Sequence, residues 1–328
     1  SKGVAITDFE LQGNAATVHR SERAALIKVF FGDFRIERGF VENSSKEGIE
    51  VDQQEFQELI DGGTIRDIVG RGCVRDVISL GGPAGPEPHI RNVLLENIRG
   101  YNSSLRGPVE VSDGCVNITV RKIYAENCSY AIDLQDHNKQ EINRHVLIDD
   151  VYALHCNHAI RTGNHPNGHS NLTLTNITAE HCKKTLYVSN TDLVTIRNVK
   201  IIGYEGEGPA MSVINCNALT IRDVDLVDCT SRSEGLLVEN CDNVTIDGVR
   251  LKNSGSLSSG VTYRISDDKI FRNLFISHVS GKDTRDTGIV LERKNKNAML
   301  RDYIISNNIA TVTDRIKGAN KVVVNNLN

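Results

Sequence analysis

A hydrophobic pattern returns about every 25 residues along most of this chain. Apolar and polar residues alternate within it, as in Val116-Asn117-Ile118-Thr119-Val120, and another Val or Ile follows three residues later. Counted from Ile148, the equivalent apolar positions lie at steps of 26, 22, 25 and 25 residues, at Leu174, Ile196, Ile221 and Ile246. A period of two indicates strands, and strands this short need neighbouring copies to bury an inner face. The sequence therefore predicts an all-β solenoid in which parallel strands pair from coil to coil.

The repeat also predicts the domain organisation. A chain of 328 residues could hold two or three globular domains, but the repeat runs from about residue 90 to the end without a Pro/Gly/Ser-rich linker. Residues 1–60 are less regular, and Asp52–Ile60 has the composition of a short helix. We expect irregular N-terminal coils or a cap over residues 1–60, followed by one continuous solenoid domain over residues 61–328.

Composition argues against several classes of partner. The chain has 38 basic and 42 acidic residues and a net charge of −4, so it lacks the basic surface that nucleic acid binding requires. No apolar stretch reaches the roughly 18 residues of a membrane span. The first residues do not resemble a signal peptide, but a mature exported protein would lack one too, so export stays open.

Eight cysteines follow the repeat. Four of them occupy equivalent turns and two share a second position of the coil, at Cys128, Cys156, Cys182 and Cys229, and at Cys216 and Cys241. Stacked coils place equivalent residues in a ladder, where Cys acts as a small buried apolar residue. The chain contains no Cys-x-x-Cys pair, which disfavours a metal site. We expect free thiols rather than disulfides.

Most of six Asn-x-Ser/Thr triplets coincide with turns of the repeat. Asn tolerates the left-handed backbone of such turns, and its amide can bond to the neighbouring backbone. We interpret these residues as turn formers rather than as glycosylation sites: Asn102, Asn117, Asn127, Asn171, Asn176 and Asn243.

These features together resemble the right-handed parallel β-helix superfamily, over roughly residues 25–328. They are the repeats, the Asn turns, the aliphatic and Cys ladders, and second strands that begin with a small residue, as in Tyr130-Ala131-Ile132-Asp133 and His158-Ala159-Ile160-Arg161. The superfamily includes pectate lyases, polygalacturonases, alginate epimerases and phage tailspikes. The resemblance implies an all-β, right-handed parallel β-helix of about 10 to 12 coils. It also implies that a polysaccharide is the ligand.

Aligning the coils predicts which side chains share a face. The inward residues of the second strands are expected to be Ile49, Val77, Val109, Ile132, Ile160, Leu186, Met211, Leu236, Val261 and Ile289. The next residue of each strand should then point outward, in a row spaced by about 4.8 Å. This row reads Glu50, Ile78, Glu110, Asp133, Arg161, Tyr187, Ser212, Leu237, Thr262 and Val290. The middle of the row, Glu110, Asp133, Arg161 and Tyr187, is the candidate site, and Gln135 joins it from two positions after Asp133. The C-terminal part of the row has no charged residues.

Histidines concentrate beside the same coils. Seven of the ten lie between residues 137 and 181, a window that also contains two atypical insertions, 136–141 and 162–169. Such loops project beside a solenoid and could form the walls of a cleft. We therefore add His137 and His158 to Glu110, Asp133, Arg161 and Tyr187 as candidate catalytic residues, and predict substrate binding by Gln135, Lys139, His165 and His169.

The residue types favour an acidic sugar. Trp is absent and aromatic residues make up 5% of the chain, so broad platforms for neutral sugars are scarce. An Arg can neutralise the carboxylate of a uronate while a His or Tyr removes the C5 proton, which leads to elimination or epimerisation. Tyr130-Ala-Ile-Asp133 is similar to the Tyr-Gly-Phe-Asp opening of the alginate C5-epimerase motif. The chain departs from that motif directly after Asp133, where the family has Pro-His-Glu.

Two alternatives to the lyase or epimerase hypothesis stay open. Glu110 and Asp133 could act as the carboxylate pair of a retaining glycoside hydrolase, with Asp133 as nucleophile and Glu110 as acid. A non-catalytic polysaccharide-binding shaft, as in phage tailspikes, would fit the same fold. That class commonly forms trimers, so we expect a homotrimer in this case, at an extracellular, cell-surface or virion location. A Ca²⁺ ion held by Glu110, Asp133 and Asp136 is a further expectation.

Overall fold

The computed structural model describes residues 3–18, 24–52, 59–81, 89–135, 142–163, 168–281, 288–316 and 318–324. Within these ranges every named element is a strand. The chain divides into two compact units, Ser1–Thr173 and Leu174–Asn328, and each unit is described by itself. The prediction of an all-β parallel solenoid is confirmed.

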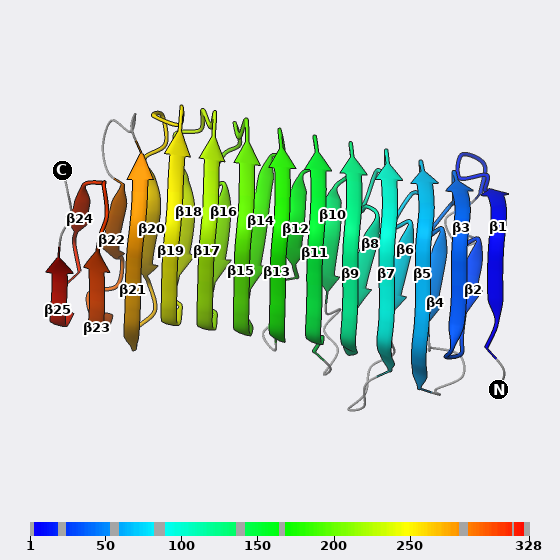
Figure 1. Cartoon of the computed structure of the whole chain (residues 1–328), viewed down its shortest axis with the longest axis horizontal. Helices are drawn as coiled ribbons and strands as arrows, with labels where there is room; N and C mark the ends of the chain where they lie inside the picture. Colours follow the sequence, from blue (N-terminus) through cyan, green and yellow to red (C-terminus); the bar gives the residue numbers. More distant parts are fainter. Residues whose placement is uncertain are drawn as a thin grey trace. The chain divides into compact units, whose positions relative to one another are not determined.

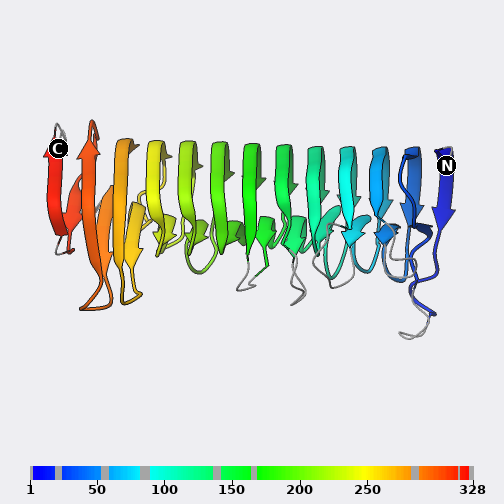
Figure 2. The same ribbon diagram turned by 90° about the horizontal axis from the view of Figure 1, so that it is seen from below.

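Long and short strands alternate along the first unit (Figure 1). The long strands are β1 (Ala5–Gln12), β3 (Phe34–Glu42), β5 (Ile60–Arg71), β7 (Ile90–Tyr101), β9 (Cys115–Glu126) and β11 (Arg144–Leu154). The short strands are β2 (Ile27–Val29), β4 (Ile49–Asp52), β6 (Ile78–Gly81), β8 (Val109–Ser112), β10 (Tyr130–Gln135) and β12 (His158–Thr162). Long strands pair in parallel with long strands, and short strands with short strands. We call the two layers the long-strand sheet and the short-strand sheet; Figure 2 shows them as separate layers.

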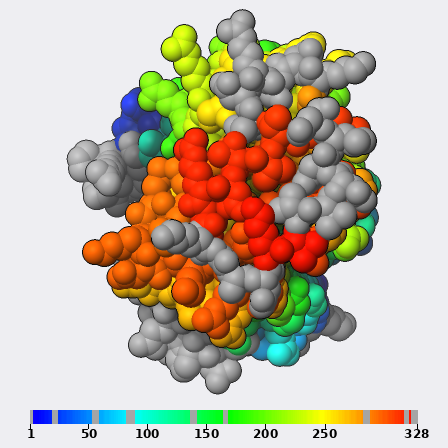
Figure 3. Space-filling model, turned by 90° about the vertical axis from the view of Figure 1, so that its left-hand side faces the viewer, coloured from blue at the N-terminus to red at the C-terminus, as the bar shows by residue number. Residues whose placement is uncertain are grey.

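The second unit repeats this arrangement. Strand β13 (His169–Glu180) starts in the first unit and ends in the second. The later long strands are β15 (Thr191–Ile202), β17 (Asn217–Val227), β19 (Asp242–Lys252), β21 (Ile270–Gly281), β23 (Met299–Ser306) and β25 (Gly318–Val324). The short strands are β14 (Lys184–Ser189), β16 (Met211–Ile214), β18 (Glu234–Glu239), β20 (Ser259–Ile265), β22 (Ile289–Arg293) and β24 (Val312–Asp314). Both layers pair in parallel here too. Figure 3 views the end of this unit where β23, β24 and β25 lie.

The core of each unit lies between its two layers and consists of stacked aliphatic residues. Ile118 pairs with Val146, and Val120 with Ile148, and all four side chains are buried. Ile196, Ile221 and Ile246 form an equivalent stack in the second unit. Each large aliphatic side chain contributes about 1.5–3 kcal/mol when it is buried. The 25-residue repeat is thus the spacing that places one aliphatic residue directly upon the next.

Left-handed residues bend the long strands where the repeat has Asn. Asn117 has a φ of 56°, and its amide nitrogen donates to Oδ1 of Asn92 in the preceding coil at 2.6 Å. The six Asn residues interpreted as turn formers have φ between 53° and 58°, and Asn43, which begins a seventh Asn-x-Ser/Thr triplet, has a φ of 51°. L-amino acids other than Asn and Asp rarely adopt this conformation, because Cβ approaches a carbonyl oxygen. The interpretation of these residues as turn formers is confirmed.

The eight cysteines are free and buried, as predicted. The Sγ atom of Cys128 lies 3.6 Å from the carbonyl oxygen of Gly100, and the backbone nitrogen of Cys216 lies 3.3 Å from Sγ of Cys241. Burial raises the pKa of the Cys73 thiol to about 11. These side chains therefore act as small core residues.

One sequence-based expectation differs from the structure, and a second lies largely outside the described residues. Four parallel strands, β1 to β4, already lie between Ala5 and Asp52, where the sequence predicts irregular coils or a cap. The helix expected over residues 52–60 lies mostly in 53–58, outside the described residues; Asp52 ends β4 and Ile60 begins β5.

The predicted inward row is correct within each unit except at one coil. Ile78, and not Val77, pairs with Ile49 and Val109, so that Ser79 takes the outward place predicted for Ile78. Both Val77 and Ile78 are buried. A Cβ atom on Gly70 would lie 2.2 Å from Cγ2 of Val77. Because Gly70 leaves this space, Val77 fills the corner before the strand, which shifts the apparent register by one residue.

Candidate functional site

The outward row of the first unit brings the predicted charged residues together. Across the short-strand sheet, Glu110 pairs with Asp133 and Asp133 with Arg161, as the alignment predicted. Their exposure differs from the expectation of an open, solvated strip. Glu110 is 1% exposed and Asp133 0% exposed, although both lie on the outer side of the sheet. Charged side chains above them exclude water from the carboxylates.

Asp133 lies at the centre of a dense set of polar contacts. Arg161 donates from Nε to Oδ1 at 2.9 Å and from Nη2 to Oδ2 at 2.7 Å. Gln135 also donates to Oδ2, and Nη1 of Arg106 lies 3.8 Å from the same oxygen. Burial is the largest single contribution and lowers the pKa of Arg161, but the hydrogen bond to Asp133 and the neighbouring negative charges together outweigh it, so the pKa of Arg161 is raised above its ordinary value. The two-point contact fixes the orientation of the guanidinium plane.

A ladder of cations that sequence reasoning missed covers the carboxylates. Lys46, Arg75 and Arg106 each lie three residues before the inward residue of their coil, and the backbone nitrogen of Arg75 donates to the carbonyl of Lys46 at 3.0 Å. We call Lys46, Arg75 and Arg106 the cation ladder. Their shared repeat position was a signal available in the sequence.

The cation ladder joins two rows of carboxylates. Arg75 lies 3.0 Å from Oε1 of Glu47 and 3.5 Å from Oε2 of Glu110. Arg106 contacts Glu110, and Lys46 lies 2.7 Å from Oε1 of Glu50. Ser79 donates to Oε2 of Glu110 at 2.8 Å. The carboxylates are thus paired and hydrogen-bonded, as burial of a charge requires.

Asp76 changes the charge balance of the network. It is fully buried, and desolvation, with a smaller opposing contribution from Arg106, raises its pKa well above the ordinary value. Desolvation also raises the pKa of Glu47. Protonation of Asp76 leaves four cations, Lys46, Arg75, Arg106 and Arg161, facing four carboxylates, Glu47, Glu50, Glu110 and Asp133. The most exposed side chains of this set are those of Lys46, Arg75 and Arg161, at 27%, 29% and 27%.

Tyr130 and His158 lie beside this charged surface. The guanidinium carbon of Arg161 is 4.2 Å from the centroid of the Tyr130 ring. Tyr130 pairs with His158 across β10 and β12, with ring centroids 5.4 Å apart. A cation at this distance from a ring is stabilised by the ring quadrupole. The structure therefore groups Arg161, Tyr130 and His158, where the sequence singled out Tyr130 only through its motif.

The remaining predicted residues fall into three groups. Tyr187 belongs to the second unit, where it pairs with Ser212. His169 is buried, with Nδ1 3.4 Å from the Asn143 amide nitrogen, so it is not an exposed loop residue as expected. His137, Lys139 and His165 lie outside the described residues, as does Asp136 of the expected Ca²⁺ site. Among the described residues, no group of three or more His, Cys, Asp and Glu could hold a metal ion.

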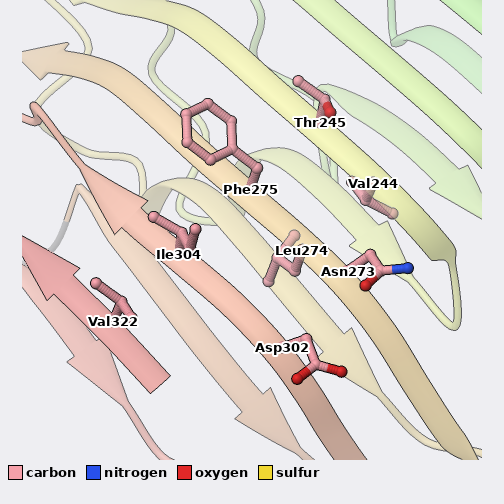
Figure 4. A pocket seen from close by; sticks show the side chains of 8 residues that line it. All are labelled: Val244, Thr245, Asn273, Leu274, Phe275, Asp302, Ile304 and Val322. Carbon is pink, nitrogen blue, oxygen red and sulfur yellow. The ribbon is translucent and has the colours of Figure 1, made fainter. Parts of the chain in front are cut away.

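The outer face of the long-strand sheet in the second unit has an apolar hollow of about 440 Å³ (Figure 4). Phe275 pairs with Thr245 and Ile304, and Ile304 with Val322, so these residues form one row across four strands. Ile304 is 42% exposed and Val322 45% exposed. Nothing in the structure identifies what would cover this row. In the described ranges, no helix has the length and apolar character needed to cross a membrane.

Comparison with known proteins supports the fold. The family described as "Right handed beta helix region" matches residues 184–327. The Azotobacter vinelandii mannuronan C-5 epimerase AlgE6 A-module is 11% identical with a TM-score of 0.53, over 98% of this chain and 90% of that one. The AlgE4 A-module from the same organism is 12% identical with a TM-score of 0.46, over 98% and 90%. No curated protein matches the chain. The fold is that of the right-handed parallel β-helix, as the sequence indicated.

Proposed function

We propose that this protein acts on an acidic, uronate-containing polysaccharide, which binds across the outer face of the short-strand sheet in the first unit. The chemistry proposed is removal of the C5 proton, followed by β-elimination or by C5 epimerisation. The observation that carries the proposal is the layering of charge. Carboxylates lie buried beneath, while Arg75, Arg106 and Arg161 lie above them, so that a ligand meets guanidinium groups.

Arg161 would bind the carboxylate of the uronate. Asp133 engages its Nε and Nη2 atoms, which leaves Nη1 as the nitrogen that faces a ligand. Pairing of the uronate carboxylate with a cation stabilises the enolate that forms when C5 loses its proton. Asp133 acts as a positioning residue, because it holds the guanidinium without touching the sugar.

His158 and Tyr130 supply the proton transfer in this proposal. His158, as a neutral imidazole, accepts the proton from C5, and the electron pair of the C–H bond moves into the enolate. In epimerisation, the Tyr130 hydroxyl returns a proton to the opposite face of C5. In elimination, the electron pair of the enolate forms the C4–C5 double bond, the bond from C4 to the glycosidic oxygen breaks, and the Tyr130 hydroxyl gives its proton to the leaving oxygen. Both routes use residues that lie beside Arg161.

The hydrolase alternative is less well supported by this arrangement. A retaining hydrolase needs a carboxylate oxygen that reaches the anomeric carbon and a second carboxyl group that donates a proton. Glu110 and Asp133 are both buried beneath arginines, and both contact Arg106. The arginine side chains therefore separate both carboxyl groups from a sugar on the outer face, which opposes direct attack on the anomeric carbon.

Two measurements on a panel of uronic acid polymers test the proposed function. Ultraviolet absorbance detects the unsaturated product of elimination, and proton NMR detects C5 inversion. New reducing ends without absorbance would establish hydrolysis, and binding without turnover would establish a binding shaft. Repeating the assays with a chelator and with added Ca²⁺ tests the calcium expectation. The homotrimer and the extracellular, cell-surface or virion location stay predictions.

A further inference from the structure

The second unit has a polar hollow on the outer side of its short-strand sheet, with a volume of about 500 Å³. Its floor is the outward row of β20, β22 and β24, where Val290 pairs with Thr262 and Thr313. Alignment of the coils within the sequence predicts an uncharged outward row in this region. The walls come from residues outside that row, which explains why the alignment did not reveal them.

Arg264 organises one wall of the hollow. Its Nη2 lies 2.6 Å from Oε1 of Glu234, its Nε 2.8 Å from Oε2 of Glu292, and its Nη1 3.5 Å from Oε2 of Glu239. Each nitrogen of the guanidinium therefore faces a carboxylate. An anionic ligand would find this arginine already neutralised, and would be repelled by Glu234 and Glu292.

The two carboxylates of the lining are held in their ionised state. Burial acts to raise the pKa of both Glu234 and Glu292, but hydrogen bonds from Arg264 and from Ser233 or Lys294 outweigh it, and both pKa values lie below the ordinary value. Ser233 donates to Oε2 of Glu234 at 2.7 Å, and Lys294 lies 2.5 Å from Oε1 of Glu292. Each carboxylate oxygen has two lone pairs, so each can accept a further hydrogen bond from a ligand.

The rest of the lining is rich in hydroxyl groups. Ser258, Ser259, Thr262 and Thr313 line the hollow together with Arg315. Ser259 and Thr262 share a hydrogen bond of 2.6 Å. The two arginines of the lining, Arg264 and Arg315, balance the two glutamates, Glu234 and Glu292, so the lining has no net charge. Its acceptors, its hydroxyls and the small apolar floor at Val290 match a ligand that carries several hydroxyl groups and no charge. Metal binding is not indicated, since no group of three potential ligands occurs in the described part of the chain.

We propose that this hollow is a carbohydrate-binding site for a neutral, hydroxyl-bearing sugar residue, separate from the cationic surface of the first unit. Glu234 and Glu292 accept hydrogen bonds from sugar hydroxyls, and the sugar lies over Val290. The inference does not depend on the proposed function.

Isothermal titration with defined hexasaccharides tests the site. The probes are neutral β-1,4-glucan, β-1,4-mannan and α-1,4-glucan hexasaccharides, with hexamers of mannuronate and galacturonate for comparison. The main variant is Val290→Phe, which fills the hollow from its floor without altering an ion pair. The control is Thr220→Phe, a half-buried residue of the long-strand sheet in the same unit. Glu234→Gln, which keeps the shape and removes the charged acceptor, is the second variant.

We expect at least one neutral hexasaccharide to bind the wild-type protein, and Val290→Phe and Glu234→Gln each to weaken that binding by about tenfold or more. Thr220→Phe should bind as the wild type does. Turnover or binding of uronate polymers should be the same in Val290→Phe as in the wild type. Absence of neutral-sugar binding by the wild type would overturn the inference, as would unchanged binding in both variants. Uronate inactivity of the wild type would refute the proposed function alone.

Discussion

Arg161 holds both carboxylate oxygens of Asp133, with Nε 2.9 Å from Oδ1 and Nη2 2.7 Å from Oδ2. Asp133 is fully buried, whereas 27% of the Arg161 side chain is exposed. The Asp133 carboxylate thus contacts Arg161 from its buried side, and the Arg161 guanidinium is the charged group that a ligand can reach. This relationship decides how each residue should respond to substitution.

Asp133→Asn should affect both stability and activity. The change removes the charge that Arg161 and Gln135 bind, so we expect a loss of about 2 kcal/mol in the free energy of unfolding, measured by urea denaturation. Turnover of the uronate polymer should fall by about 10²-fold, because Arg161 loses its orientation. Full activity with unchanged stability would show that the site lies elsewhere.

Arg161→Ala should discriminate between charged and neutral substrates. We expect KM to rise for the carboxylated polymer and to change much less for its methyl ester, because only the former pairs with the guanidinium. Arg121→Ala is the matched control, since Arg121 lies on the long-strand sheet with its Nε 3.1 Å from Glu96. Equal effects of Arg161→Ala on both polymers would contradict carboxylate recognition.

Asp76→Asn should change the pH dependence of stability. The folded-state pKa of Asp76 is raised above its ordinary value of 3.8, so the folded protein binds this proton more tightly than the unfolded chain. The associated stability is present below pH 3.8 and is lost as pH rises through the folded-state pKa. Asn cannot ionise, so the variant should lose less stability between acidic and neutral pH. Urea unfolding at a series of pH values measures this, and parallel curves for the two proteins would refute it.

Substitution of Asn117 tests whether the left-handed backbone at this position strains other residues. Replacement by Ala should destabilise the protein by about 1 kcal/mol more than replacement by Gly, because Gly adopts a φ of 56° without a Cβ clash. Both variants lose the hydrogen bond to Asn92, so their difference isolates the backbone contribution. Thermal unfolding of the two variants provides the comparison, and equal melting temperatures would argue against strain at this position.

The cysteines provide a test of the interior ladders. Thiol titration of denatured protein should find eight free thiols, and reductant should leave the melting temperature unchanged. Native protein should react slowly, because the thiols are buried away from the reagent. Discovery of disulfides in the native protein would contradict this arrangement.

The amino-acid sequence alone determined the solenoid, because its repeat of aliphatic residues has only one way to bury them: by stacking coil upon coil. Ile148 over Val120 and the Asn92–Asn117 contact follow directly from equivalent repeat positions. The pairing of Asp133 with Arg161 was predictable for the same reason. In the inward row, the pattern misled at Val77 and Ile78, where Gly70 makes room for a second buried residue.

The tertiary structure alone decided which polar groups are buried and which face a ligand. Outward position on a strand predicted exposure for Glu110 and Asp133, but Arg106 and its neighbours fold over them from turns that strand periodicity does not describe. Long side chains reach several ångströms from their backbone, so their contacts depend on how the chain folds in space and not only on the number of residues between them. The polar hollow around Arg264 escaped sequence reasoning for the same cause, because its walls converge from the ends of strands two coils apart.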